Sequence, residues 1–227
     1  MQFEHGISLG AWCQVDYQLT RFFQKRTISC FDGLVTPWHS LLGILRDGTA
    51  DLGKSVKDNR YAQSAECLKY GVLFAHEFPK NDAKEILFSM EAMRNMASKM
   101  HYKHEKMIRT LSSATGPVLF VRYGANAMPA IAWPYNKEPE SFDLSQLDVL
   151  TKILANLFPK LIFRLLFVYE EATTMIVNAN AKLDQRVSVV AIQGDNNYRR
   201  WEGDDRVWDR ILDNERNNIL LPPAVLS

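Results

Sequence analysis

The sequence predicts an α/β fold in a single domain, residues 1–227, with a layered, mostly parallel sheet and helices on both of its faces. Three stretches of the second half are apolar almost throughout, at residues 117–123, 161–170 and 186–193. Strands of this kind are typical of parallel sheets, because both of their faces are buried. Helical patterns alternate with these stretches, and helices are the usual connections between parallel strands. A chain of 227 residues is long enough to bury a substantial core.

The first predicted elements lie on the two sides of a cysteine. A short apolar run at residues 7–9 leads to Gly10, and a helix is expected from Gln14 onward. The apolar residues of this helix recur at the spacing of one helical face: Val15, Leu19, Phe22 and Phe23. Cys13 is therefore expected at or near the first turn of the helix.

The rest of the chain contains patterns of further elements. Residues 26–31 lean toward a β conformation before a turn at residues 32–33, and residues 70–78 form another apolar run. Residues 49–67 are mixed and polar, which favours a loop with short helical pieces. Residues 125–140, rich in proline, asparagine and aromatic residues, are expected to form a loop. The remaining helices are expected at residues 38–45, 83–112, 141–158 and 205–217.

Composition and charge argue against several classes of function. The net charge of +1 offers no overall attraction to nucleic acid or to acidic lipid, so neither is expected as a partner. The longest apolar run, near residues 161–169, contains Arg164 and is too short to span a membrane. No basic segment followed by an apolar stretch opens the sequence, so no signal peptide is expected. Three cysteines at irregular spacing argue against a disulfide framework and favour a reducing, cytoplasmic location.

No cofactor and no metal site are expected. The glycine patterns of dinucleotide-binding and P-loop proteins, GxGxxG and GxxxxGK[ST], do not occur. His101 and His104 share one face of a predicted helix, but basic residues surround them and would repel a metal cation. These basic residues are Lys99, Lys103, Lys106 and Arg109. A solvated basic face is the favoured interpretation.

Cys13 is the main candidate for chemistry. Unpaired backbone N–H groups and the helix dipole favour an anion at a helix start, so the pKa of a thiol there can be lowered. The alternative is an inert packing residue, because unpaired cysteines are often buried. A cysteine nucleophile needs a base, for which His76 beside Glu77 is the candidate; the alternative for His76 is a hydrogen-bonded histidine at a strand end. Asp32 is the candidate for orienting the base, and alternatively it makes a turn through its side chain.

Polar or reactive residues also occur where the predicted strands end. In parallel sheets ligands bind at the carboxyl ends of the strands. The residues at such ends are Gly10 to Cys13, His76, Arg122 and Tyr123, Glu170 and Glu171, and Gly194 and Asp195. Arg122 ends a buried strand, so it either pairs with a carboxylate or holds an anionic ligand. We expect Gly10, Trp12, Arg122 and Tyr123 to contribute to substrate binding.

Several blocks of the sequence resemble one bacterial family. The first two blocks are Ser8-Leu9-Gly10-x-x-Cys13-x-Val15-x-Tyr17-Gln18-Leu19-x-Arg21 and Phe31-Asp32-Gly33-Leu34-Val35-Thr36-Pro37. The shorter blocks are Phe74-x-His76-x-Phe78, Leu119-Phe120-Val121-Arg122 and Gly203-Asp204-Asp205-x-x-Trp208. Together they are similar to the papain-like cysteine peptidases of bacteria, a domain family of unknown function. The resemblance implies Cys13 as nucleophile, His76 as base and Asp32 as acidic partner, with a papain-like α+β fold as the alternative architecture.

The sequence thus favours a cysteine-dependent hydrolase or a transferase of acyl or amide groups, acting on a small molecule or a peptide. Two alternatives stay open. One is a glycosyl- or phosphoryl-type transferase that binds a nucleotide-like ligand at the sheet edge, with Cys13 merely packed. The other is a non-catalytic binding module on the same scaffold.

Overall fold

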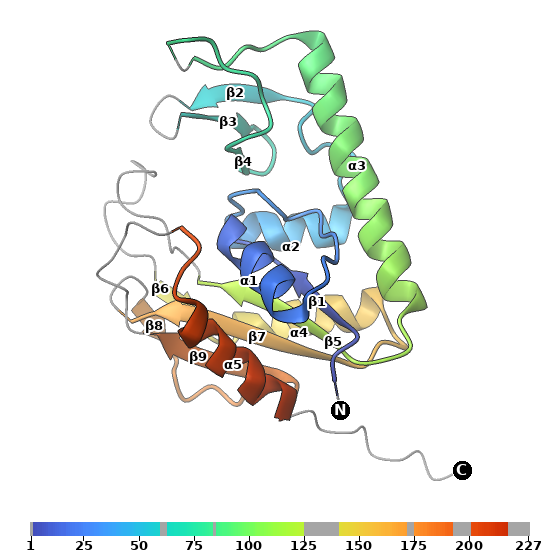
Figure 1. The fold of residues 1–227 in the computed structure, drawn as a ribbon, viewed down its shortest axis with the longest axis vertical. Coiled ribbons are helices and arrows are strands. Elements are labelled where there is room, and N and C mark those ends of the chain that lie inside the picture. Colours follow the sequence, from blue (N-terminus) through green and yellow to red (C-terminus); the bar gives the residue numbers. More distant parts are fainter. Residues whose placement is uncertain are drawn as a thin grey trace.

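The main sheet consists of four parallel strands, β1 (His5–Ser8), β5 (Val118–Tyr123), β7 (Phe163–Glu170) and β9 (Val187–Ile192). They lie in the order β1-β5-β7-β9 (Figure 1). Every residue of β5 is buried, as expected of a central strand in a parallel sheet. The computed structural model describes residues 2–59, 63–83, 85–124, 141–171, 175–192 and 201–217. The prediction of a mixed fold with a mostly parallel sheet is confirmed to this extent.

Helices pack against this sheet through two hydrophobic clusters. The helices are α1 (Cys13–Phe23), α2 (Trp38–Asp47), α3 (Met90–Ser113), α4 (Gln146–Leu157) and α5 (Asp205–Asn217). Along β5, Leu119 and Val121 belong to the cluster that holds the buried residues of α1 and α5. Val118 and Phe120 belong to the cluster that holds those of α2, α3 and α4. Because neighbouring residues of a strand point to opposite faces, helices cover both faces of the sheet.

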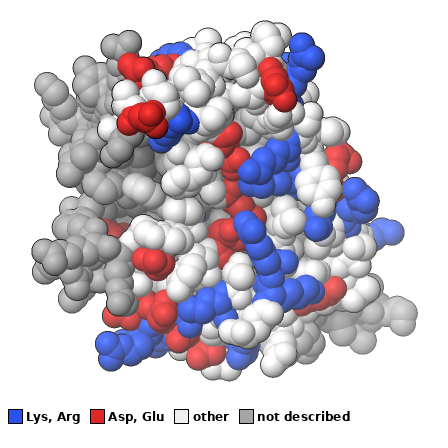
Figure 2. All heavy atoms as spheres, turned by 45° about the horizontal axis from the view of Figure 1, so that its top comes forward, with Lys and Arg blue, Asp and Glu red and all other residues white. Residues whose placement is uncertain are grey.

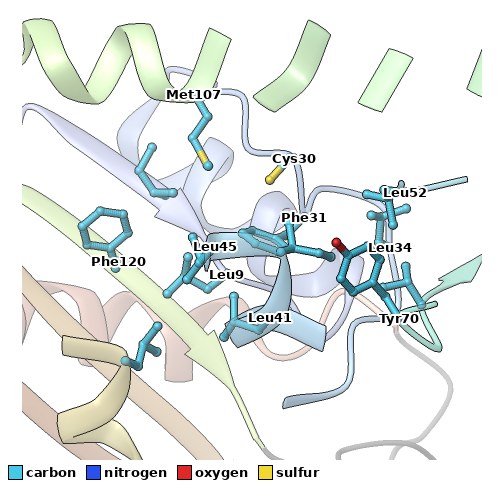
Figure 3. Close-up of a cluster of buried hydrophobic side chains, with 14 of the residues drawn as sticks. Leu9, Cys30, Phe31, Leu34, Leu41, Leu45, Leu52, Tyr70, Met107 and Phe120 are labelled. Carbon is cyan, nitrogen blue, oxygen red and sulfur yellow. The ribbon is translucent and has the colours of Figure 1, made fainter. Parts of the chain in front are cut away.

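The second cluster also encloses two of the three cysteines. Cys30 and Cys67 are fully buried in it, whereas Cys13 is only half-buried. Figure 3 shows Cys30 beside Phe31, with Met107 of α3 and Phe120 of β5 in the same cluster. All three cysteines are free thiols, as their spacing predicts.

A smaller antiparallel sheet contradicts the sequence prediction for residues 49–67. It contains β2 (Val56–Asn59), β3 (Ser64–Cys67) and β4 (Leu73–Phe74), beside the amino-terminal half of α3 (Figure 1). The sequence of β2 is polar because only one of its four residues is buried, so the segment had the composition of a loop. The apolar run at residues 70–78 contributes only the two residues of β4 to the sheet.

Two helix starts and one expected strand also differ from the prediction. Helix α3 begins at Met90 rather than near residue 83, because Ser89 caps it by accepting a hydrogen bond from the backbone N–H of Ala92. Helix α4 begins at Gln146, because β6 (Ser141–Asp143) pairs with β8 (Met175–Val177). Residues 26–31 form no strand.

The predicted helices at 38–45 and 205–217 are confirmed. The predicted loop at residues 125–140 lies outside the described residues, as do Gly194 and Asp195. Within the described parts of the chain, the helices are too short or too polar to cross a membrane.

Candidate functional site

The segment that follows β1 lies at the carboxyl edge of the parallel sheet. The backbone N–H of Leu9 donates to the carbonyl of Val121 at 2.8 Å, and that of Tyr123 donates to the carbonyl of Gly10 at 3.0 Å. Gly10 has a φ of +77°, and a Cβ atom there would lie 3.0 Å from Nη1 of Arg122. A side chain at this position would therefore be both strained and crowded. The glycine lets the chain pass closely over the end of β5.

Cys13 is the first residue of α1, and its thiol is half-buried at the helix start. Burial raises the pKa of this thiol, although the backbone N–H groups of Cys13 and Gln14 act in the opposite direction. The negative charges of Asp16 and Glu202 raise the pKa further. The helix start thus has the expected effect on Cys13, but burial outweighs it. The free protein holds Cys13 as a neutral thiol at neutral pH.

Arg122, on β5, donates hydrogen bonds to the segment that follows β1 and to Thr36, which precedes α2. Its side chain is fully buried, and its Nη1 and Nη2 donate hydrogen bonds of 2.7 Å to the carbonyls of Leu9 and Thr36. The guanidinium carbon lies 5.7 Å from the ring centre of Trp38. Burial lowers the pKa of Arg122 to about 9, so it stays charged at neutral pH. Neither expected partner, a carboxylate or an anionic ligand, accounts for these two bonds, because the acceptors are the backbone carbonyls of Leu9 and Thr36.

Trp12 and Tyr123 lie on the side of the sheet covered by α1 and α5. Trp12 is half-buried just before α1, and its buried Nε1 has no hydrogen-bond partner among the described residues. The hydroxyl of Tyr123 donates a short hydrogen bond to Glu170, and its ring lies 6.0 Å from that of Trp208. Burial and the neighbouring Glu170 raise the pKa of Tyr123. Tyr123 is thus a buried, hydrogen-bonded residue with 2% of its surface exposed.

Asp32 is buried in the turn that follows α1, beside the end of β1. Its Oδ2 accepts a 2.8 Å hydrogen bond from the backbone N–H of Ser29, whose hydroxyl in turn donates to the carbonyl of Ser8. Its Oδ1 is buried without a hydrogen-bond partner among the described residues. Burial, together with the negative charge of Asp16, raises the pKa of Asp32 to about 7.

His76 is an exposed residue in the bend after β4. Its neighbour Glu77 makes a short ion pair with Lys99 and lies 3.9 Å from Lys103. Lys103 also donates a 2.9 Å hydrogen bond to the backbone carbonyl of Asp32. The structure therefore brings the segment of His76 and Glu77 close to Asp32. No described hydrogen bond or ion pair joins His76 itself to Cys13 or Asp32.

The segment of Trp201 and Glu202 lies against α1, and the sequence did not predict this neighbour of Cys13. Trp201 is 55% exposed and makes an edge-to-face contact with Tyr17 of α1, with ring centres 5.5 Å apart. The next residue, Glu202, is close enough for its charge to act on the Cys13 thiol. Gln18 ties this segment to α1 by donating to the carbonyl of Glu202 at 2.7 Å. No local pattern could reveal this neighbourhood, because about 180 residues separate the two segments.

The described residues around the site do not form a metal-binding cluster. No group of three or more metal-ligating side chains occurs within the described ranges. Figure 2 shows acidic and basic side chains intermixed over the described part of the face it displays.

Comparisons with protein-family models, with curated proteins and with solved structures produced no match to this chain.

Proposed function

We propose that the protein is a cysteine-dependent hydrolase or a transferase of acyl or amide groups, with Cys13 as its nucleophile. The observation that carries the proposal is the position of Cys13 at the first residue of α1, half-exposed at the carboxyl edge of a parallel sheet. The backbone N–H groups of Cys13 and Gln14 favour a negative charge at the sulfur. The motif resemblance to papain-like cysteine peptidases supports the same role.

The reaction would proceed through a covalent intermediate. The sulfur of Cys13 attacks the carbonyl carbon of an ester or amide, the thiol proton passes to a base, and the alcohol or amine leaves with a proton. Water or a second acceptor then takes the acyl group and restores the thiol. Free N–H groups of the first turn of α1 stabilise the negative charge that develops on the carbonyl oxygen. Since burial raises the resting pKa of Cys13, proton removal must accompany substrate binding.

Two residues are candidates for this base. The resemblance assigns the role to His76, with Asp32 as its acidic partner, and this assignment requires the exposed ring of His76 to reach the thiol. Glu202 is the second candidate, because its charge already acts on Cys13. Asp16 is less suited, because Arg26 pairs with it at 2.8 Å. Replacing His76 and Glu202 separately by glutamine distinguishes them, since only loss of the true base abolishes turnover.

The architecture that we infer for the whole chain is a layered α/β fold rather than a papain-like α+β fold. The inference is supported by the parallel pairing of β1, β5, β7 and β9 and by the two hydrophobic clusters on opposite faces of this sheet.

Alkylation with iodoacetamide, located by peptide mass spectrometry, tests the nucleophile. We expect Cys13 to react in the folded protein at least about tenfold faster than Cys30 and Cys67, because the latter two are fully buried. Its rate should rise with a midpoint above about 8.5, the ordinary pKa of cysteine. A panel of esters, thioesters and amides should be hydrolysed by the wild type and not by Cys13→Ser. No labelling of Cys13 without denaturant would refute the proposal.

A second candidate is a binding module without catalysis. The raised pKa of Cys13 favours it, because a neutral, half-buried thiol is a weak nucleophile. A binding module would keep its ligand-induced rise in melting temperature in Cys13→Ser. An enzyme would lose turnover in the same variant.

A further inference from the structure

A cavity lies at the opposite end of β1 from Cys13. Its volume is about 280 Å³. Its walls come from β1 and the residues before it, from the end of α1 with the turn that follows, and from the last turn of α5. The lining residues that matter for its chemistry are Phe3, Glu4, His5, Phe22, Lys25 and Arg216. Three separate segments of the chain thus build one small, polar hollow.

Basic side chains converge on this cavity. Lys25 makes no described ion pair or hydrogen bond, and its charge is close enough to lower the pKa of His5. The guanidinium carbon of Arg216 lies 4.6 Å from the ring centre of Phe22, and its Nη1 is 3.6 Å from Asp213. Cations brought together from different segments repel each other unless an anion lies between them.

The carboxylate of Glu4 also lines the cavity and offsets only one of the two positive charges of Lys25 and Arg216. Its Oε2 accepts hydrogen bonds from the backbone N–H groups of Thr115 and Gly116, which are worth more to a charged carboxylate. These bonds lower the pKa of Glu4 and tie one oxygen to the segment before β5.

His5 supplies a buried polar wall. Only 8% of its surface is exposed, and its Nδ1 lies 3.2 Å from the hydroxyl oxygen of Thr27, which also lines the cavity. Its Nε2 lies 3.4 Å from Glu4. Burial lowers the pKa of His5, so its ring is neutral near pH 7, and the charged residues that line the cavity are Lys25, Arg216 and Glu4.

We propose that this cavity binds a small tetrahedral anion, such as the phosphate or sulfate group of a small molecule, between Lys25 and Arg216. Arginine and lysine are the usual partners of such groups. The phenyl rings of Phe3 and Phe22 give an organic substituent an apolar surface. The site is independent of Cys13 and does not rest on the proposed activity.

Titration calorimetry with sodium sulfate, at an ionic strength held constant with sodium chloride, tests the site. We expect saturable binding of one sulfate, weakened about tenfold or more in Lys25→Gln and in Arg216→Gln, because each loses a charge-assisted contact. Arg210→Gln and Lys152→Gln are matched controls, since both residues are exposed and lie outside the cavity. Arg210 is also on α5, so it controls for charge removal from that helix.

The controls should keep their affinity for sulfate within about twofold. Thermal unfolding without sulfate verifies that each variant folds, so that a loss of binding is attributable to the cavity.

Phenyl phosphate in place of sulfate identifies the source of the anion. Tighter binding assigns the cavity to a phosphate monoester, and weaker binding assigns it to a free inorganic anion. Absence of saturable sulfate binding, or an equal loss in the controls, would overturn the proposal.

Discussion

Arg122 and Asp32 are both buried ionisable residues beside the segment that follows β1. They differ in their hydrogen-bond partners and in their charge at neutral pH. Arg122 donates 2.7 Å hydrogen bonds to the carbonyls of Leu9 and Thr36, which lie in two different segments. Asp32 accepts a single described side-chain hydrogen bond, from Ser29, and its other oxygen has no partner among the described residues. The difference appears in their titration. Arg122, with a pKa of about 9, is charged at neutral pH, whereas Asp32, with a pKa of about 7, is partly protonated.

This comparison shows that burial alone does not decide whether a charge persists. Burial lowers the pKa of Arg122 and raises that of Asp32, because in both cases it disfavours the charged form. The guanidinium keeps its proton because an arginine begins far above neutrality and finds two acceptors. The carboxyl begins far below neutrality, and the two nearby cations, Lys103 and Arg26, do not offset the desolvation. The charge of Arg122 therefore persists through neutral pH, whereas the charge of Asp32 changes with pH in this range.

The largest effect is expected for Arg122→Met. The substitution leaves the carbonyls of Leu9 and Thr36 without their donors and removes the contact with Trp38. We expect the free energy of unfolding to fall by about 3 kcal/mol, measured by urea denaturation. The loss should be the same near pH 5 and near pH 8, because Arg122 is charged at both.

Arg122→Lys is the control for this prediction. A lysine keeps the charge but cannot reach both carbonyls in the same geometry, so an intermediate loss is expected. A loss below about 1 kcal/mol for Arg122→Met would show that these two hydrogen bonds contribute little.

Asp32→Asn should change the pH dependence of stability. The folded-state pKa of about 7 lies above the ordinary value of 3.8, so the folded protein binds more protons than the unfolded chain between these values. The carboxyl therefore makes the wild type less stable as the pH rises from about 4 to about 7, by about 1.4 kcal/mol for each unit of pKa shift. Asparagine keeps an acceptor for Ser29 and does not titrate. Relative to the wild type, the variant should gain stability across this range.

Urea denaturation of both proteins near pH 5 and near pH 8 measures this change. Parallel pH profiles for wild type and Asp32→Asn would contradict the prediction.

The smallest effect is expected for Arg26→Gln. The side chain of Arg26 is 54% exposed and pairs with Asp16 at 2.8 Å, and exposed ion pairs contribute about 0.2–1 kcal/mol. We expect a change below about 1 kcal/mol in the free energy of unfolding. Because the charge of Arg26 lowers the pKa of Asp32, its removal should shift the titration of Asp32 slightly upward. A loss as large as that of Arg122→Met would contradict this prediction.

Local sequence patterns were sufficient to predict the strands and helices that bury a continuous or periodic set of apolar residues. The strands β5, β7 and β9 were visible as apolar runs, and α1 and α5 were visible from the spacing of their apolar residues. The position of Cys13 at a helix start followed from the same pattern. The hairpin of β2 and β3 was missed, because its exposed side chains are polar and its hydrogen bonds are made to another strand.

The sequence by itself determined that the chain builds a mixed fold with a parallel sheet and that Cys13 lies at its edge, because periodicity and glycine placement are local properties. Tertiary structure alone decided which groups surround that thiol and how they titrate. The tertiary structure places Glu202 near Cys13 and two backbone carbonyls beside the guanidinium of Arg122. It also leaves Oδ1 of Asp32 without a hydrogen-bond partner among the described residues. The pKa shifts depend on burial and on charged groups that lie far apart in the sequence, so they cannot be predicted from local spacing.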